Sequence, residues 1–461
     1  MTLIKSISGI RGTIGGAAGD NLTPNDIVSF TGAFASLIKL KHDKPVLIVG
    51  RDGRNSGPMV QSFVCQTLVA MGIDVLDAGL TTTPSLEMAI IKEEAQGGIM
   101  ITASHNPMHW NALKFMNEAG EFIDAKTGEE LLNKSNGPII YNLYDNLGTI
   151  TPYKKSISDH INSILRLKLV DVALVRKRKY KIVVDAINST GSIAIPQLLE
   201  KMGCQCILIN GDINGVFDHN PEPLPEHITG LTAAVIEHKA DLGIIVDPDV
   251  DRLAFVCENG EAFGEEYTLV SVADYITSKQ KGNTVSNLSS TQALKDITIS
   301  NGGEYSASAV GEVNVVTQMK AVSAIIGGEG NGGIIYPALH YGRDALVGIA
   351  LFLTQLAEFK KPVSLLRAKY PNYEISKNKI ELKSKNHMDL IFKKLKEQYA
   401  KHKINSEDGL RIDLDKDWVH LRQSNTEPII RIYAESVSKV VADHLAKKLI
   451  DDIQDIQKEL K

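Results

Sequence analysis

The sequence predicts an α/β protein of several domains that ends in a separate α+β module. Two observations predict this: short β-rich runs alternate with helical patterns along most of the chain, and the pattern changes after about residue 370. The length of 461 residues adds a third, because domains usually hold about 100–150 residues, which suggests three or four of them. The 43% hydrophobic and 23% charged residues are ordinary for globular domains.

Each β-rich run is followed by a turn with Gly or Asp and then by a helical pattern. Such runs lie at residues 45–50, 181–185, 242–247 and 324–329. The alternation predicts βαβ units and mostly parallel sheets. The polar residues after each run should then lie along one rim of a sheet, where α/β proteins bind their ligands.

Loop-rich stretches predict the domain limits. Residues 134–153 contain two X-Pro turns and close a first domain, and Lys369-Tyr-Pro-Asn marks the exit from a third. A second limit falls just after the acidic residues near 250. We therefore predict domains at 1–155, 156–257, 258–369 and 370–461.

The last domain combines short strands with two helices. We expect a strand near 379–382, a helix near 388–402, three strands between 409 and 435, and a long helix from about 436. Apolar residues recur in that helix at a spacing of three or four, which predicts one face packed on a sheet: Val440, Val441, Leu445, Leu449, Ile453 and Ile456.

Charge and hydropathy exclude several classes of partner. A net charge of −5 gives no general attraction to nucleic acid or to an anionic membrane. The N-terminal residues contain no signal-peptide core, and the longest apolar stretch, 345–353, is too short to span a bilayer. We expect a cytoplasmic protein without nucleic-acid or membrane partners. Its four cysteines are too scattered for a disulfide framework or a zinc site.

Three aspartates alternate directly after the apolar run 242–246: Asp247, Asp249 and Asp251. An extended backbone would aim their carboxylates to one side, where they would repel one another without a cation. Oxygen ligands favour Mg²⁺ or Ca²⁺ over zinc. A calcium EF-hand loop needs glycine where Arg252 stands, so we favour Mg²⁺, and a solvated acidic turn is the other alternative.

Ser104 lies in the Pro-closed loop Ile101-Thr-Ala-Ser-His-Asn-Pro107, at the carboxyl end of a predicted strand. It could be a turn residue, a hydrolase nucleophile or a phosphate carrier. The nucleophile motif G-x-S-x-G is missing here. A phosphate carrier needs positive groups to disperse charge during transfer, and the candidates are Arg11, His105, Lys114 and Arg252. Lys114 could also be a solvated surface lysine.

Three further segments carry glycines or anion-binding side chains. Gly9-Ile-Arg-Gly12 places an arginine between glycines, and Gly50-Arg-Asp-Gly-Arg54 is a turn that we expect mainly to shape the first domain. Arg422-Gln-Ser-Asn-Thr-Glu-Pro428, with Arg431 just beyond, collects the donors of a phosphate site, although a polar hairpin is the alternative. Residues 327–333 form a Gly-rich turn around Glu329 and Asn331.

Together these segments resemble the α-D-phosphohexomutase superfamily over nearly the whole chain. The resemblance implies three similar mixed α/β domains and a C-terminal α+β domain around a central cleft. It also implies an intramolecular phosphotransferase that acts on a small phosphosugar. Four positions depart from the usual motifs: Ala112 for glycine, Asn331 for serine, and Gln423 and Asn425 in the phosphate loop.

The resemblance also implies a role for each candidate residue. Ser104 would carry the phosphate, and that phosphate would complete the Mg²⁺ coordination by Asp247, Asp249 and Asp251. Arg11, His105, Lys114 and Arg252 would lie near the transferring group, with Lys114 as acid or base. The substrate-binding residues would be Glu329, Asn331, Arg422, Ser424, Asn425, Thr426 and Arg431.

The sequence therefore predicts a phosphohexomutase that works through a phosphoserine and a bisphosphate intermediate, with a sugar 1,6-bisphosphate as activator. We favour the interconversion of glucosamine 6-phosphate and glucosamine 1-phosphate, and a phosphoglucomutase/phosphomannomutase is the alternative. A metal-dependent sugar phosphatase and a sugar-phosphate sensor are more distant alternatives. The oligomeric state is expected to be monomer or homodimer.

Overall fold

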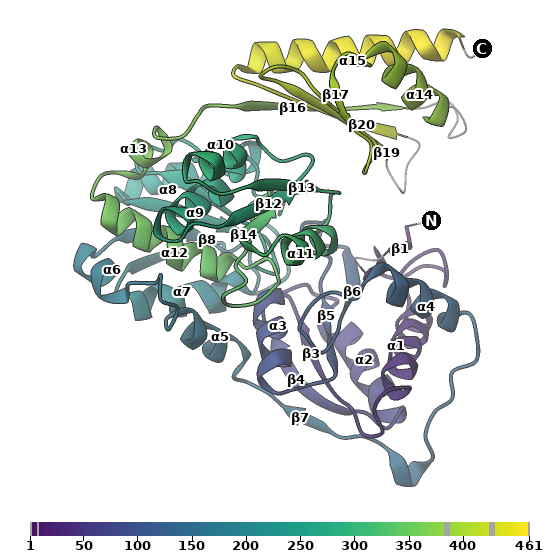
Figure 1. Ribbon diagram of the computed structural model, residues 1–461. Coiled ribbons are helices and arrows are strands. Elements are labelled where there is room, and N and C mark those ends of the chain that lie inside the picture. The colour runs from purple at the N-terminus through teal and green to yellow at the C-terminus, as the bar shows by residue number, and fades with distance from the viewer. Residues whose placement is uncertain (1, 7–8, 382–387, 424–428, 460–461) are drawn as a thin grey trace.

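Four β-sheets organise the computed structural model, which describes residues 2–6, 9–381, 388–423 and 429–459 (Figure 1). Each sheet lies within one of the ranges 1–155, 156–257, 258–369 and 370–461, which remain our proposed limits for domains I to IV. The fold is α/β, with three mixed domains followed by an α+β domain. No helix in the described ranges is long and apolar enough to cross a membrane.

Domain I contains a seven-stranded sheet in the order β1-β2-β6-β5-β3-β4-β7. Its strands are β1 (Ile4–Ser6), β2 (Gly9–Thr13), β3 (Val46–Arg51), β4 (Asp74–Leu80), β5 (Gly97–Ile101), β6 (Trp110–Met116) and β7 (Ile150–Pro152). Its helices are α1 (Pro24–Lys39), α2 (Gly57–Ala70), α3 (Thr83–Lys92) and α4 (Ala125–Ser135), with the 3-10 turn η1 (Tyr144–Asn146). Strands β5, β3, β4 and β7 are parallel, and β6, β2 and β1 continue the sheet antiparallel.

Domains II and III each have a four-stranded sheet, in the orders β11-β10-β8-β9 and β13-β12-β14-β15. Domain II contains β8 (Lys181–Asp185), β9 (Gln205–Ile209), β10 (Leu242–Val246), β11 (Leu253–Cys257), α5 (Ser156–Ile164), α6 (Val172–Arg178), α7 (Gly191–Met202), η2 (Pro225–His227) and α8 (Thr229–His238). Domain III contains β12 (Asn283–Asn287), β13 (Tyr305–Ser308), β14 (Ala324–Glu329), β15 (Gly333–Ile335), α9 (Glu265–Lys279), α10 (Ala293–Ser300), α11 (Glu312–Ala321), α12 (Ala345–Phe359) and α13 (Val363–Arg367).

One detail of the predicted topology is wrong. The β-rich runs at residues 242–247 and 324–329 form β10 and β14, and each is followed by an antiparallel strand and not by a helix. Strand β10 forms a hairpin with β11, and β14 forms a hairpin with β15. The reason is that β11 is itself a buried apolar run, and the short loop before it turns the chain back. Strands β5 and β6 form the same hairpin in domain I. Three equivalent hairpin loops result, at residues 102–109, 247–252 and 330–332.

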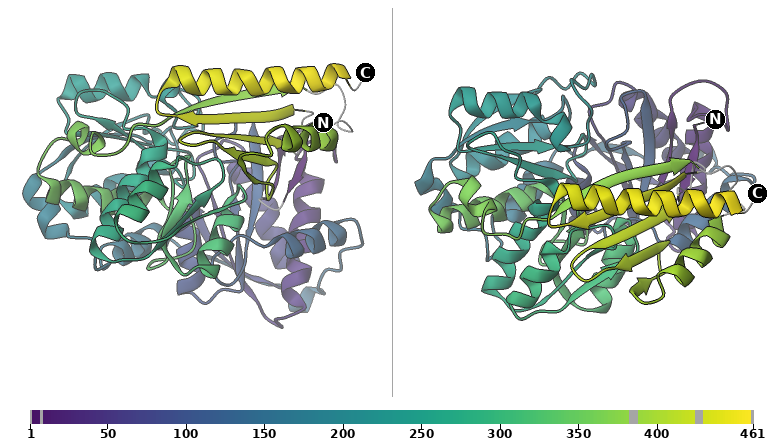
Figure 2. Two further views of the ribbon diagram at one scale, coloured as in Figure 1. Left: turned by 45° about the horizontal axis from the view of Figure 1, so that its top comes forward. Right: turned by 90° about the horizontal axis from the view of Figure 1, so that it is seen from above.

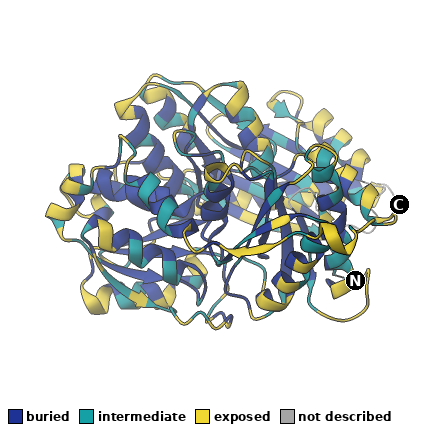
Figure 3. Ribbon diagram, turned by 90° about the horizontal axis from the view of Figure 1, so that it is seen from below, coloured by how far each residue is buried: buried dark blue, intermediate teal, exposed yellow. Residues whose placement is uncertain are grey.

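Domains II and III share one apolar core. Helix α12 is buried from Ala345 to Ala357, and it packs against α5, α6 and α7 of domain II as well as α9 of domain III. The same cluster of buried side chains extends from Ile157 to Tyr370. In Figure 3 the strands are mostly buried, and the exposed turns lie on the outer helices and connecting loops. The shared core fixes the two loops at 247–252 and 330–332 relative to each other.

A buried polar cluster ties domain I to these two domains. His160 of α5 contacts Ser85 Oγ of α3 through Nδ1 at 3.0 Å and Asp344 Oδ2 through Nε2 at 2.9 Å. His340 lies between Asp344 and Glu87 of α3. Burial alone would lower the pKa of His340, but these two carboxylates outweigh it and raise the pKa to about 10. A charged imidazole therefore links the domains.

Domain IV is a five-stranded antiparallel sheet with two helices. It contains β16 (Glu374–Glu381), β17 (Lys403–Asn405), β18 (Leu410–Asp413), β19 (Trp418–Gln423), β20 (Ile429–Ser436), α14 (Met388–Gln398) and α15 (Lys439–Glu459). Helix α15 runs along the outer side of the sheet, away from the other domains (Figures 1 and 2).

The buried face of α15 differs from the prediction at its start. Leu449, Ile453 and Ile456 face the sheet as expected, but Val440 is 79% exposed and Val441 is 40% exposed. Two alanines of the first turns, at 442 and 446, are buried instead. The small side chains let the helix approach the sheet closely, and hydropathy alone does not identify such contacts.

Shortening of a buried side chain on α15 should lower the stability of domain IV. We expect Ile453→Ala to lower its free energy of unfolding by about 2–5 kcal/mol, because the change leaves a cavity in the core. Val440→Ala is the matched control and should change it by less than about 0.5 kcal/mol. The fluorescence of buried Trp418 during urea unfolding, in a Trp110→Phe background, measures the difference. Equal unfolding midpoints would contradict the packing of α15.

Candidate active site

Ser104 is held in an unusual backbone conformation at the carboxyl end of β5. Its φ is 47°, in the left-handed region that non-glycine residues rarely adopt. The amide of Ser104 donates to Thr102 Oγ1 at 2.9 Å, and Thr102 Oγ1 donates to Asp52 Oδ2 at 2.7 Å. Backbone strain of this kind persists only where the surroundings impose it, and it is common at functional sites.

Arg54 imposes the conformation of the serine loop. Its guanidinium is fully buried and donates to four carbonyl oxygens of the loop, those of Ser104 (2.5 Å), Asn106 (2.7 Å), Pro107 (2.6 Å) and Trp110 (3.0 Å). Asp52 accepts from Arg54 Nε at 3.0 Å and so fixes the guanidinium. The turn at 50–54 therefore does more than shape domain I. It determines where the serine hydroxyl points.

A second contact links this turn to the acidic loop of domain II. The Gly53 amide donates to Ser189 Oγ at 2.9 Å, and Ser189 Oγ donates to the carbonyl of Pro248 at 2.6 Å. All of these atoms are buried. The serine loop and the acidic loop are thus held together through hydrogen bonds that cross the domain boundary.

The three aspartates of the acidic loop lie side by side, as the sequence predicts. Asp247, Asp249 and Asp251 are fully buried, and their ligand atoms lie within 4.8 Å of one another. Ser104 Oγ donates to Asp247 Oδ2 at 2.6 Å. The serine hydroxyl therefore faces the acidic group directly, across the boundary between domains I and II.

The aspartates fit a divalent cation. Asp249 Oδ1 and Asp251 Oδ1 are buried without a hydrogen-bond partner. Burial, followed by repulsion from Asp251 and Asp249, raises the pKa of Asp247 well above its usual value. A cation would satisfy the free oxygens and remove the repulsion, and three carboxylates suit Mg²⁺. The donor set and its unpaired oxygens thus agree with the metal ligands expected from the sequence.

Lys114 and His105 flank the serine and the aspartates. Lys114 Nζ lies 2.8 Å from Asp249 Oδ2 and 3.6 Å from Asp251 Oδ2. Burial alone would lower the pKa of Lys114, but the two carboxylates raise it above its usual value, so the side chain is an ammonium and not a surface lysine. His105 Nδ1 is 3.4 Å from Ser104 Oγ. Burial, followed by the charge of Arg252, lowers the pKa of His105, which is therefore neutral.

Guanidinium groups from three domains lie near enough for their charges to act on one another. Burial, followed by the charges of Arg431 and then Arg252, lowers the pKa of Arg11. These effects show that Arg11 of domain I, Arg252 of domain II and Arg431 of domain IV lie close together. Arg252 Nη1 pairs with Glu222 at 2.9 Å, and the Nε atoms of Arg11 and Arg252 have no hydrogen-bond partner. Such a group of cations suits a phosphate.

The Gly-rich loop of domain III presents a fixed carboxylate. Glu329 Oε1 accepts from Asn287 Nδ2 at 2.9 Å and from the Gly311 amide at 3.0 Å. Its Oε2 accepts from Arg343 Nη1 at 2.8 Å. Asn331 Oδ1 is buried beside it without a partner. A carboxylate held in this way suits recognition of sugar hydroxyls.

Domain IV contributes two arginines that lie directly opposite each other on β19 and β20, Arg422 and Arg431. Arg422 Nε pairs with Asp408 Oδ2 at 2.7 Å, and Asp408 also accepts from the Val310 amide of domain III at 2.9 Å. Ser424, Asn425 and Thr426 lie outside the described residues. Their part in phosphate binding stays a prediction.

Sequence reasoning missed several residues that orient this site. Arg343 and Asp408 were not singled out, nor was Thr83, whose hydroxyl donates to Asp249 Oδ2 at 2.5 Å. Thr83 begins α3 in Thr81-Thr-Thr-Pro84, a helix-start pattern that places its hydroxyl and amide at a loop. The run His340-Tyr-Gly-Arg-Asp344 before an apolar helix is a comparable pattern. The residues that they contact lie far away in the sequence, so the sequence alone did not reveal these contacts.

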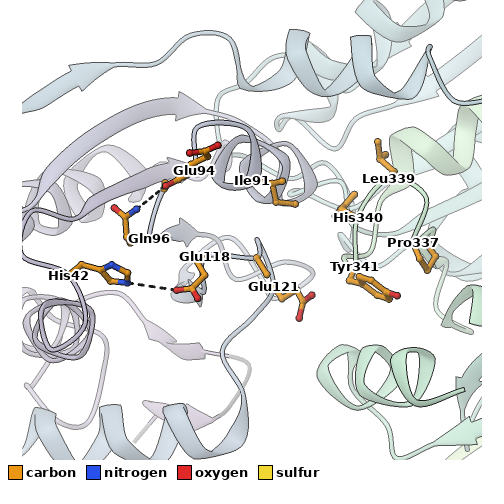
Figure 4. A pocket seen from close by; sticks show the side chains of 12 residues that line it. His42, Ile91, Glu94, Gln96, Glu118, Glu121, Pro337, Leu339, His340 and Tyr341 are labelled. Carbon is orange, nitrogen blue, oxygen red and sulfur yellow. Dashed lines mark hydrogen bonds and ion pairs between the residues drawn. The ribbon is translucent and has the colours of Figure 1, made fainter. Parts of the chain in front are cut away.

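A cavity of about 590 Å³ lies between domains I and III but belongs to another part of the molecule (Figure 4). Gln96 and Glu118, which line it, lie at the end of the β5–β6 hairpin opposite the Ser104 loop. His42 and Glu118, both of domain I, lie 3.9 Å apart on one side of it. No predicted site residue that the structure describes lines this cavity, so the candidate site is formed by the loops and not by this hollow.

The fold and the site define a metal-assisted phosphotransferase built from four domains. Four family models match the chain: phosphoglucomutase/phosphomannomutase alpha/beta/alpha domain I at residues 3–137, domain II at 158–260, domain III at 264–373, and the C-terminal domain at 379–452. The chain belongs to the phosphoglucomutase/phosphomannomutase family of the α-D-phosphohexomutase superfamily. It is thus an isomerase-class phosphotransferase.

Curated relatives cover almost the full chain. A "Phosphoglucomutase/phosphomannomutase" of Thermococcus kodakarensis is 33% identical over 93% of this chain and 94% of its own. A "Probable phosphoglucosamine mutase" of Methanopyrus kandleri is 32% identical over 97% of both chains. A solved phosphoglucomutase/phosphomannomutase family protein from Burkholderia thailandensis superposes with a TM-score of 0.84 at 25% identity and covers 99% of this chain and 98% of its own.

Replacement of Arg54 should impair catalysis, because its buried guanidinium holds the serine loop. Lysine cannot donate to four carbonyl groups in one plane, so Arg54→Lys should displace Ser104 and lower the mutase rate by about 100-fold. Arg51→Lys, in the same turn, is the matched control, because Arg51 contacts Gln61 and the Asp52 carbonyl and not the serine loop. Steady-state rates of both variants, with circular dichroism to verify folding, make the comparison. Similar rates for the two would refute the role of Arg54.

Proposed function

We propose that this protein interconverts glucosamine 6-phosphate and glucosamine 1-phosphate through a phosphorylated Ser104. One observation carries the proposal: the Ser104 hydroxyl, held in a strained conformation, lies 2.6 Å from Asp247 in a buried group of three aspartates. That geometry suits a phosphate bound to the serine and a cation bound to the acids. The family membership supports the general reaction, and the choice of sugar is our inference.

The reaction needs positions for two phosphates and one sugar. Phosphorylated Ser104 transfers its phosphoryl group to the free hydroxyl of the sugar monophosphate: the bond from phosphorus to the serine oxygen breaks, the sugar hydroxyl loses its proton, and the serine oxygen takes up a proton. The resulting bisphosphate turns around, and its other phosphoryl group returns to Ser104. A bound Mg²⁺ would be held by Asp247, Asp249 and Asp251, and it would neutralise charge on the transferring group. A sugar 1,6-bisphosphate would phosphorylate the resting enzyme and so act as activator.

The residues of this chain divide the remaining tasks. Lys114 is an ammonium close to the acidic loop, so it can donate a proton when a phosphoryl group leaves an oxygen. Neutral His105 lies beside the serine oxygen, and its Nδ1 can donate a hydrogen bond to that oxygen. We propose that Arg11, Arg252, Arg422 and Arg431 hold the two phosphates, and that Glu329 and Asn331 bind the sugar hydroxyls. Contact of domain IV with the other domains would exclude water and so limit hydrolysis.

The preference for glucosamine phosphate rests on two segments and on names of relatives. Residues 8–12 and 327–333 resemble both hexosamine mutases and archaeal-type members, with Asn331 in place of serine. Several relatives carry the name phosphoglucosamine mutase, and one from Sulfurisphaera tokodaii, 31% identical over 96% of this chain and 97% of its own, is named "Phosphoglucosamine/phosphogalactosamine mutase". A phosphoglucomutase/phosphomannomutase of mixed specificity is the second candidate, favoured by the Thermococcus relative.

Ser104→Ala should abolish turnover and leave the fold intact, because the variant lacks the oxygen that carries the phosphate. Intact-protein mass should show the gain of one phosphoryl group when wild type is incubated with glucose 1,6-bisphosphate and Mg²⁺. The variant should show no gain of mass. Removal of Mg²⁺ with a chelator should suppress the gain of a phosphoryl group in wild type. Substantial activity in Ser104→Ala would refute the carrier role, and an unchanged wild-type mass would favour a non-catalytic sensor.

Assays of the 1-phosphates of glucosamine, glucose and mannose side by side test the choice of substrate. We expect the highest kcat/KM with glucosamine 1-phosphate. A clear preference for glucose or mannose would overturn the choice of sugar but not the reaction. Release of inorganic phosphate in proportion to substrate consumed would point instead to a metal-dependent phosphatase.

A further inference from the structure

Arg343 connects the acidic loop to the sugar-recognition loop. Its Nη2 lies 2.7 Å from Asp251 Oδ2, its Nη1 lies 2.8 Å from Glu329 Oε2, and its Nε lies 2.9 Å from Glu312 Oε2. The three carboxylates come from three elements: the loop after β10, the end of β14 and the first turn of α11. One guanidinium therefore joins domain II to two parts of domain III.

This arrangement requires an arginine. All three contacts are buried, and only about 10% of the Arg343 side chain is exposed. A planar guanidinium presents donors in a fixed fork, so Arg343 donates hydrogen bonds to Glu329 and Asp251 through Nη1 and Nη2 while its charge lies against Glu312. A lysine ammonium is a compact point charge on a flexible stem. Loss of the charge would leave Glu329 and Glu312 as buried acids without their main cation, which is costly. The position of Glu329 thus depends on Arg343.

Gly333 gives Arg343 the space it needs. A Cβ at residue 333 would overlap Arg343 Cδ and would come within 3.3 Å of Asn331 Oδ1. The backbone of Gly333 is not in the left-handed region, so any residue could adopt its conformation. Glycine is required here for the side chain of Arg343 and not for the backbone. The sugar-recognition loop and Arg343 are therefore sterically matched.

We propose that Arg343 is the positioning residue that fixes the sugar-recognition carboxylate Glu329 against the metal-binding loop, and that Gly333 admits it. The proposal deepens the proposed function, on which it rests, because it names the residue that joins the sugar site to the metal site. Arg343 acts through Glu329 and Asp251 and is not itself required to touch the sugar.

The proposal predicts that the affinity for the sugar phosphate falls while the affinity for Mg²⁺ does not. In Arg343→Met, Glu329 loses its orientation, so the affinity for glucosamine 1-phosphate should fall about tenfold or more. Asp251 loses a competing cation, so the affinity for Mg²⁺ should stay the same or rise. Calorimetric titration of each ligand into the unphosphorylated protein measures both affinities without turnover. Arg343→Lys keeps the charge and should lie between wild type and Arg343→Met for the sugar phosphate.

A second variant tests the steric match without changing any charge. Gly333→Ala should displace Arg343 and weaken sugar phosphate binding, and the double variant with Arg343→Met should be no weaker than Arg343→Met alone, because both changes remove the same interaction. Gly230→Ala is the matched control, since a Cβ there meets no atom within 4 Å, and it should bind like wild type.

Three results would overturn the proposal. They are unchanged sugar phosphate affinity in a folded Arg343→Met protein, additive losses in the double variant, or parallel losses of sugar phosphate and Mg²⁺ affinity together with a lower Tm. The last result would mean that Arg343 only supports the fold. Failure of the proposed function can be distinguished from failure of the Arg343 proposal. In the first case wild type would convert none of the three sugar phosphates, and the binding titrations would still test the role of Arg343.

Discussion

Repulsion among three buried carboxylates on one short loop is the constraint on which the arrangement of the site depends. Asp247, Asp249 and Asp251 cannot all stay ionised away from water unless positive charge faces them. Domain II supplies only Arg252 close by in the sequence. The other cations come from Lys114 of domain I and Arg343 of domain III. Burial alone would raise the pKa of Asp251, but Arg343 and Lys114 outweigh it and lower the pKa below its usual value. The acidic loop is therefore stable only where three domains meet.

The three α/β domains use the same structural position for three different tasks. In each, the loop between a parallel strand and its antiparallel neighbour carries the functional residues: Ser104 after β5, the aspartates after β10, and Asn331 after β14. The carboxyl ends of parallel strands leave free amide groups and space for side chains. Equivalent loops are brought face to face by the shared core of domains II and III and by the cluster around Asp344. They hold the residues proposed as carrier, metal ligands and sugar contact.

Much of this site could be predicted because its chemical residues are adjacent in the sequence. The alternation of Asp247, Asp249 and Asp251 after a buried strand indicates a metal loop without any knowledge of the fold. Residues that act through tertiary contacts could not be found in this way. Arg54 looks like any turn arginine until its four carbonyl partners, at least 50 positions away, are in place. The same holds for the start of α15, where alanines are buried against the sheet and the expected valines are exposed. The distance between helix and sheet, and not hydropathy, determines which side chains make this contact.

The distribution of charge among the domains suits a substrate that must turn around. The arginines proposed to bind phosphate come from domains I, II and IV, at Arg11, Arg252, Arg422 and Arg431. Domain III instead presents Glu329, whose charge Arg343 balances, and a carboxylate repels phosphate but accepts hydrogen bonds from hydroxyl groups. A bisphosphate could therefore exchange its two ends between cationic regions while its uncharged middle stays near Glu329. In the proposed reaction, recognition of the sugar and recognition of the phosphates would be separated by charge, so a reversal of the ends need not disturb the centre.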